Sequence, residues 1–184
     1  SMYSSILASE LGRDPAHAAT IDARYIEDLR RFAPMHDIGK VGVSDSILLK
    51  PGRLTDEERT EMMRHSLVGG AVLRRCEAQM QQRGRSVFAI GIEIAEGHHE
   101  KWDGSGYPRG IAGKAIPLSA RIVAVADVFD ALTSRRPYKE AWPIDRALAA
   151  IDQDSGRHFD PAVVAALHRA LPKILAFYEQ HKHV

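Results

Sequence analysis

The segment LSARIVAVADVFDALTS, residues 118–134, decides the fold class. It contains several β-branched side chains, which favour strands, but it is too long and too regular for a strand. Its large apolar residues recur at intervals of three and four, as they do along one face of a helix; they are Ile122, Val125, Phe129 and Leu132. The segment therefore predicts a helix, with Asp127 set among alanines and valines inside it.

Helical spacing of apolar residues continues over almost the whole chain. Predicted helices begin near residues 3, 22, 55, 87, 118, 143 and 160, with Asp22 as a cap and Thr55 to Glu58 as a capping box that starts a long helix. Pro172 is expected to kink or break the last helix. No alternating strand pattern longer than four residues and no internal repeat occurs. We therefore predict an all-α fold, a compact bundle of about seven helices in a single domain spanning 1–184.

Composition excludes several classes of protein. The 25 Lys and Arg residues balance 24 Asp and Glu residues, so bulk charge gives no reason to expect DNA or an anionic membrane as a partner. No apolar run approaches the roughly 20 residues that cross a bilayer. Cys76 is the single cysteine, which excludes an internal disulfide and a zinc site built from several thiolates. A reducing, cytoplasmic location is expected.

Histidine and aspartate residues on four predicted helices suggest a metal centre. One such residue alone is more often structural, but a buried carboxylate is costly without a partner, and helix bundles build metal sites from facing helices. Nitrogen and oxygen ligands suit Fe, Mn, Zn, Co or Ni, and six of them are too many for one catalytic ion with an open position. Two ions bridged by Asp37 would suit phosphate-ester hydrolysis. The six candidate ligands are His36, Asp37, His65, His98, His99 and Asp127.

The motifs HDIGKVGV and HHEKWDGSGYP resemble those of the HD-GYP domain, a branch of the HD metal-dependent phosphohydrolases. The resemblance runs from about Arg31 to Pro161 and includes LLKPGRLT, IPLSARIVAVADVFDALTSRRPYKE and SGRHFDP. It implies that the same six residues bind two divalent metal ions, with Fe or Mn preferred over Zn, Ni, Co or Mg, and a third ion in some members. It also implies hydrolysis of cyclic di-GMP to pGpG, to GMP, or to both.

The resemblance also implies roles for residues outside the ligand set. Lys40 would contact the scissile phosphate and act with Asp37 in catalysis, although its spacing fits an exposed loop lysine equally well. Arg136 and Lys139 would hold substrate phosphate. Tyr107 and Gly106 would contact the substrate, with Tyr107 as simple loop packing left open. Gly104 and Gly106 are expected to permit backbone conformations that other residues avoid.

The resemblance implies partners as well as a departure from the family pattern. Expected partners are cyclic di-GMP, GGDEF-domain proteins that dock on the GYP loop, an upstream receiver or sensory domain, and a second copy in a homodimer. The family's first helix, with its Glu-x-x-x-His element, has no counterpart here, so the domain is expected to be N-terminally truncated. One ion would then keep only His36, Asp37 and Asp127, and hydrolysis would be weak or absent.

Two other functions remain open from the sequence. The chain could be an HD phosphohydrolase acting on another nucleotide, or a non-catalytic signalling module that docks partners through the GYP loop. Metal content together with turnover of cyclic di-GMP separates these alternatives from a cyclic di-GMP phosphodiesterase.

Overall fold

A computed structural model describes residues 2–84, 86–135 and 140–181. Every regular element in those ranges is helical, as the sequence predicts. The α-helices are α1 (Met2–Leu11), α2 (Pro15–Ala18), α3 (Ala23–Phe32), α4 (Asp45–Leu48), α5 (Asp56–Met63), α6 (His65–Gln81), α7 (Ala89–Gly97), α8 (Leu118–Thr133), α9 (Ile144–Gln153) and α10 (Pro161–His181). Three short 3-10 helices are η1 (Ala33–Met35), η2 (Ile38–Gly42) and η3 (Gly113–Ala115).

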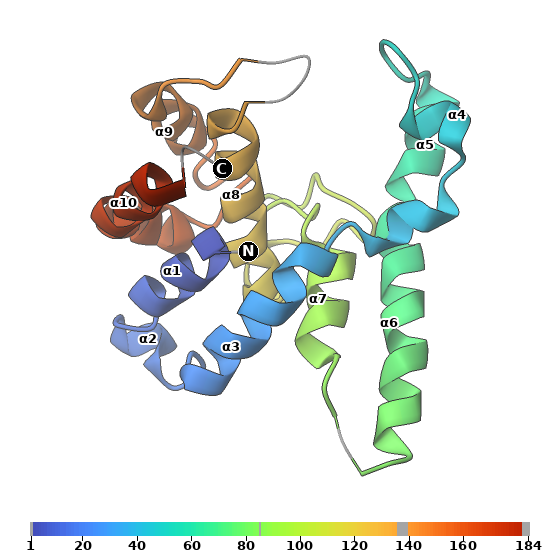
Figure 1. Cartoon of the computed structure of the whole chain (residues 1–184), viewed down its shortest axis with the longest axis horizontal. Helices are drawn as coiled ribbons and strands as arrows, with labels where there is room; N and C mark the ends of the chain where they lie inside the picture. Colours follow the sequence, from blue (N-terminus) through green and yellow to red (C-terminus); the bar gives the residue numbers. More distant parts are fainter. Residues whose placement is uncertain (1, 85, 136–139, 182–184) are drawn as a thin grey trace.

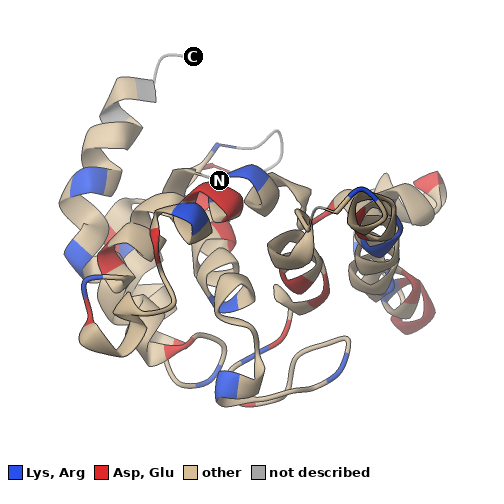
Figure 2. Cartoon of the chain, turned by 90° about the horizontal axis from the view of Figure 1, so that it is seen from below, with Lys and Arg blue, Asp and Glu red and all other residues tan. Residues whose placement is uncertain are grey.

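The helices are arranged in two groups with α7 between them (Figure 1). On one side α8 packs against α1, α7, α9 and α10, and on the other α6 packs against α7 and η2. Helices α4 and α5 continue the column that α6 begins. Figure 2 shows basic and acidic residues interspersed along the helices, in line with the nearly balanced composition.

Helix α8 is the buried centre of the first group. Ile122, Val125 and Phe129 are at most 1% exposed, so the apolar stripe predicted from the sequence faces the core. Burial of such side chains stabilises each by about 1.5–3 kcal/mol relative to an exposed position. Asp127 therefore projects from a rigid, well-packed helix.

The predicted helix starts are confirmed, but the predicted long helix after Thr55 is wrong. Thr55 and Glu58 form the capping box of α5, and α5 ends at Met63. At the junction, His65 Nδ1 contacts the carbonyl of Met62 at 2.7 Å, and the Ser66 hydroxyl donates to the carbonyl of Met63. These contacts flank a one-residue turn at Arg64, which divides the segment into α5 and α6 and makes His65 the first residue of α6.

Two further differences concern helix ends. Asp14 and Pro15 do more than end α1, because Asp14 caps the one-turn helix α2 through the backbone N–H of Ala16. Of the kink or break predicted at Pro172, the break is wrong, since α10 continues through it, and the kink stays a prediction. Pro172 and His168, whose carbonyl loses its helical donor, are both exposed, so water can take the free carbonyl. No helix in the described ranges has the length and apolarity that crossing a membrane requires.

Candidate metal centre

Four separate segments carry the predicted ligands. His36 and Asp37 lie between η1 and η2, where α3 has ended, and His65 begins α6. His98 caps the C-terminus of α7 and His99 follows it, while Asp127 lies in α8. The fold thus joins ligands that are far apart in the sequence.

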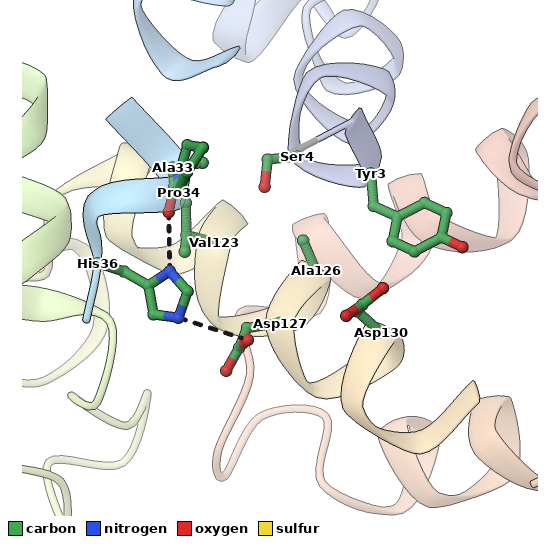
Figure 3. Close-up of a pocket in the computed structure, with 9 residues that line it drawn as sticks. All are labelled: Tyr3, Ser4, Ala33, Pro34, His36, Val123, Ala126, Asp127 and Asp130. Atoms are coloured by element: carbon green, nitrogen blue, oxygen red, sulfur yellow. Dashed lines mark hydrogen bonds and ion pairs between the residues drawn. The ribbon is translucent and has the colours of Figure 1, made fainter. Parts of the chain in front are cut away.

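The two carboxylate oxygens of Asp37 face two different groups of ligands. Oδ1 lies 3.4 Å from His65 Nε2 and 3.9 Å from His98 Nε2. Ligand atoms of Asp37, His65, His98 and His99 all lie within 4.8 Å of one another. Oδ2 lies 3.5 Å from His36 Nε2, which in turn lies 3.6 Å from Asp127 Oδ1 (Figure 3). One carboxylate therefore connects both groups, the geometry expected of a bridging ligand.

Backbone carbonyls orient three of the imidazoles. Nδ1 of His36 contacts the carbonyl of Ala33 at 2.8 Å, and Nδ1 of His98 contacts that of Ile94 at 2.9 Å, in the same way that His65 contacts Met62. A proton on Nδ1 leaves the lone pair on Nε2, which is the arrangement of a metal-ligating histidine.

Buried nitrogen atoms without a protein partner support this assignment. Nε2 of His65 and Nε2 of His98 are both buried, and neither has a hydrogen-bond partner among the described residues. A buried polar atom without a partner is costly, and a divalent cation facing Asp37 would satisfy both nitrogens. The donor set, imidazole nitrogen and carboxylate oxygen, fits such an ion.

Contacts between Asp37 and its neighbours shift the pKa values of both Asp37 and His36. Partial burial alone would raise the pKa of Asp37, but hydrogen bonding and charge from His36 and Lys40 hold it well below its usual range. Lys40 Nζ donates to Asp37 Oδ2 at 2.6 Å. Burial acts against protonation of His36, yet contacts with Asp37, the Ala33 carbonyl and Asp127 raise its pKa. The structure thus places Lys40 at the centre instead of on a remote loop.

The two adjacent histidines are held in the neutral form. Burial lowers the pKa of His98 to about 4, and the nearby charge of His36 acts in the same direction. Burial and the neighbouring His98 lower the pKa of His99 to about 2. Neutral imidazole is the form that binds a metal ion, so at neutral pH these two ligands need not lose a proton.

The loop that carries Gly106, Tyr107 and Pro108, called the GYP loop here, packs against His99 of this pair. The ring of Tyr107 stacks on that of His99, with centroids 4.6 Å apart and an angle of 23° between the planes. Burial raises the pKa of Tyr107 to about 12, so its hydroxyl remains a donor at neutral pH. Gly104 has the left-handed φ of 84° that was expected. Gly106 does not, and a Cβ there would lie 2.3 Å from the Lys101 nitrogen, so close packing is what requires glycine.

Two glutamates that flank the histidine pair were missed by the sequence analysis. Glu96 is 5% exposed and pairs with Arg74 of α6 and with Arg109, which follows the GYP turn. Glu100 is 2% exposed, and its Oε1 accepts the backbone N–H of Arg109 at 2.7 Å. Both acids therefore anchor the GYP loop. Acids adjoining a histidine pair and three glycines were the available signal, but each alone resembles a surface charge.

The predicted phosphate contacts lie in the segment that follows α8. Arg136 and Lys139 lie outside the described residues, so their predicted contact with substrate phosphate stays a prediction. Arg135, which precedes them, is largely exposed and lies 3.6 Å from the equally exposed Glu140.

A small cavity of about 100 Å³ adjoins His36 and Asp127 (Figure 3). Tyr3 and Ser4 of α1 and Asp130 of α8 complete its polar wall. The group formed by His36, Asp37 and Asp127 is thus the more open of the two, and α1 is the element that faces it.

The fold and the site together define a class of protein. It is all-helical, and its candidate metal centre is built around one aspartate carboxylate that faces two groups of candidate ligands. A family model described as the HD domain matches residues 4–163. The chain therefore belongs to the HD domain family, and its motifs place it among the HD-GYP domains, as the sequence predicted.

Individual proteins similar to this chain point the same way. Over 181 residues it is 49% identical to a cyclic di-GMP phosphodiesterase of Vibrio cholerae, a match that covers 98% of this chain and 36% of the relative. Over 137 residues it is 54% identical to the cyclic di-GMP phosphodiesterase response regulator RpfG of Xanthomonas campestris, covering 74% of this chain and 34% of that protein. The chain thus spans about a third of the length of these curated relatives.

A solved structure supports the fold. The crystal structure of a cyclic GMP-AMP specific phosphodiesterase from V. cholerae aligns with a TM-score of 0.60 over 92% of this chain and 44% of that chain. Sequence identity in that comparison is 21%, so the likeness concerns the fold.

Proposed function

We propose that this chain is a metal-dependent phosphodiesterase that hydrolyses cyclic di-GMP to pGpG, GMP or both. The observation that carries the proposal is the position of Asp37, whose two oxygens face separate groups of imidazole and carboxylate ligands. A second line of support comes from the names of the two relatives, which describe cyclic di-GMP phosphodiesterases.

We assign the six predicted residues as ligands of two divalent ions. His65, His98 and His99 with Asp37 Oδ1 would hold one ion, and His36 and Asp127 with Asp37 Oδ2 would hold the other. Among metals that accept nitrogen and oxygen donors, Fe or Mn is our choice. When bound, such a pair supplies a nucleophilic water at neutral pH and neutralises charge on the phosphodiester.

The chain's own residues supply orientation and a proton. The ammonium group of Lys40, held 2.6 Å from Asp37 Oδ2, brings a positive charge and a transferable proton to the side where the phosphodiester would lie. Tyr107, protonated and stacked on His99, covers the centre and offers a hydroxyl donor to the nucleotide. Gly106 keeps the loop packed tightly enough to hold Tyr107 there.

Metal stoichiometry and turnover test the proposal together. The purified chain, reconstituted with Mn²⁺ or Fe²⁺ under anaerobic conditions, is expected to bind two ions and convert cyclic di-GMP to pGpG or GMP, as resolved by chromatography. A chain with two ions that leaves cyclic di-GMP intact but cleaves another nucleotide would identify a different HD phosphohydrolase. A chain with neither metal nor turnover would favour the non-catalytic docking module.

Predictions about the whole protein rest on the longer relatives. The name of one relative calls it a response regulator, and we propose that this domain likewise acts under an upstream receiver or sensory domain in the cytoplasm. Docking of GGDEF-domain proteins on the GYP loop, homodimer formation and a single domain over 1–184 all stay predictions.

A further inference from the structure

A second, larger cavity adjoins the metal centre through Tyr107. Its volume is about 530 Å³, within the range of roughly 300–1,000 Å³ that is usual for small-molecule sites. Because the ring of Tyr107 also stacks on His99, this cavity lies one aromatic ring away from the candidate ligands. The residues that line it come from α5 and the segment before it, and from the GYP loop: Arg53, Leu54, Arg59, Met62, Met63 and Tyr107.

The lining combines apolar surface with unpaired positive charge. Leu54, Met62, Met63 and the Tyr107 ring form a surface suited to a flat aromatic ligand. Arg53 and Arg59 are exposed, and neither forms an ion pair with an acid in the described part of the chain. Nearby basic residues do form such pairs, Lys50 with Glu58 and Arg64 with Glu61. The two arginines are therefore available to a ligand.

Arg59 is the better placed of the two arginines to recognise a ligand. It lies on helix α5, whose first turn is fixed by the capping box, whereas Arg53 lies in the non-helical segment between α4 and α5. Its positive charge is also near enough to Tyr107 to oppose the rise in pKa that burial causes. A guanidinium can donate two parallel hydrogen bonds to a ligand.

Guanine is the base that matches this donor pattern. It presents two acceptors, O6 and N7, on one edge, and an arginine bonds both, whereas adenine places an amino donor where guanine has O6. We propose that this cavity binds one guanine base of the cyclic dinucleotide while the phosphodiester lies at the metal centre, and that Arg59 recognises the O6 and N7 edge. The inference rests on the proposed function, since it assigns part of the same substrate.

Selectivity between guanine and adenine gives a direct test. Arg59→Gln is expected to lower kcat/KM for cyclic di-GMP roughly 10- to 100-fold and to lower the ratio of cyclic di-GMP to cyclic di-AMP turnover, because Gln pairs with adenine. Arg59→Lys keeps the charge but loses the planar fork, so the ratio should fall there too. Arg24→Gln, an exposed arginine on α3, serves as the matched control and should leave both values unchanged.

The ratio separates base recognition from general damage, because a misfolded or metal-poor variant loses turnover of both dinucleotides equally. Unchanged selectivity in Arg59→Gln would overturn the assignment of the guanine site. Calorimetric titration of the metal-free chain with GMP and AMP supplies a second readout: the wild type should bind GMP more tightly than AMP, and Arg59→Gln should remove the difference.

Failure of the proposed function looks different from failure of this inference. A metal-loaded wild type that leaves cyclic di-GMP intact would overturn the proposed function, and the cavity would then be judged by GMP binding alone. Equal GMP binding by the wild type and Arg59→Gln would overturn the guanine site, whatever the turnover.

Discussion

At the scale of single residues, three of the candidate ligand histidines owe their orientation to the backbone that precedes them. His36 and His65 each contact a carbonyl three residues earlier, and His98 contacts one four residues earlier. These carbonyls lie at the ends or junctions of helices, and those of Ala33 and Ile94 also accept the backbone N–H of the histidine that follows. The end of a helix therefore supplies both the position of an imidazole and the tautomer that a metal ion needs.

Asp37 is the residue on which both groups of ligands depend. Replacing it by asparagine keeps the size of the side chain but removes the negative charge and one acceptor. We expect Asp37→Asn to lose at least one metal ion per chain and to lower turnover by about 100-fold or more, since even residues that only support a ligand cost 10- to 100-fold. Elemental analysis and steady-state kinetics measure both effects.

Asp152→Asn is the control for this substitution. Asp152 lies on α9, is exposed, and accepts a hydrogen bond from His168. It should retain full metal content and turnover. An Asp37→Asn chain that still binds two ions would show that the carboxylate does not bridge them.

Residue types indicated the candidate ligands, which the fold brings close together, but not the residues that surround them. Six histidines and aspartates stand out in the sequence because their chemistry is unusual on apolar helices. Glu96 and Glu100 do not stand out, because their partners, Arg74 and Arg109 for Glu96 and the backbone of Arg109 for Glu100, are known only once the chain has folded. The reason for glycine at position 106 was also misjudged, since it concerns neighbouring backbone and not the local φ.

At the scale of helices and loops, periodicity predicted where most helices lie but not where one is interrupted. The stripe of α8 was visible because packing against several helices requires it. The division between α5 and α6 was not, because the apolar spacing continues across the one-residue turn at Arg64. That division matters for function, since it makes His65 the first residue of α6.

Glu96 connects three elements, because its carboxylate in α7 pairs with Arg74 in α6 and with Arg109 after the GYP turn. Glu96→Gln should destabilise the metal-free chain by about 1.5–3 kcal/mol, the range for hydrogen bonds to charged groups. The two arginines are about half exposed, which keeps the cost below that of a fully buried pair. Urea denaturation measures it.

Glu61→Gln is the matched control, because Glu61 pairs with Arg64 on the surface of α5. Its effect should stay within about 1 kcal/mol. Equal stability losses in Glu96→Gln and Glu61→Gln would contradict an anchoring role for Glu96.

The start of α7 is held by a carboxylate from α6, and this makes its stability depend on pH. Glu77 accepts hydrogen bonds from the Ser86 hydroxyl and from the backbone N–H groups of Val87 and Phe88. These bonds, that of Ser86 first, lower the pKa of Glu77 from 4.5 to about 2. Above pH 4.5 the stabilisation is complete. As the pH falls from 4.5 to about 2, the unfolded chain takes up the proton first, so the stabilisation is lost.

Glu77→Gln should therefore be less stable than the wild type at neutral pH, and the difference should shrink as the pH falls through this window. Denaturant unfolding of both chains at several pH values measures the difference directly, and other acids titrate equally in both. A difference that stays constant between pH 7 and pH 2 would exclude Glu77 as its source.

At the scale of the whole molecule, the candidate metal centre combines segments that are far apart in the sequence. Asp37 follows α3, His65 begins α6, the histidine pair ends α7, and Asp127 lies in α8. These elements pack mainly in neighbouring pairs, such as α6 with α7 and α7 with α8. One bound ion would contact three of these segments and the other ion would contact two, so the pair together would join all four, and its binding free energy would stabilise the whole fold and not a single helix.

Metal binding should therefore raise the melting temperature of the entire chain. At a free ion concentration about 100 times the dissociation constant, the gain is about 2.7 kcal/mol, which corresponds to roughly 5–10 °C for a chain of this size. Differential scanning calorimetry with Mn²⁺, and again after addition of a chelator, measures the shift and its reversal. Asp37→Asn should show a much smaller shift, because its amide cannot serve both groups of ligands. Because the candidate ligands lie on four segments that unfold together, we expect one unfolding transition. Metal binding should shift the whole of that transition to a higher temperature. A rise confined to one of two resolved transitions, or an equal rise in Asp37→Asn, would mean that the ions bind elsewhere or hold only part of the fold.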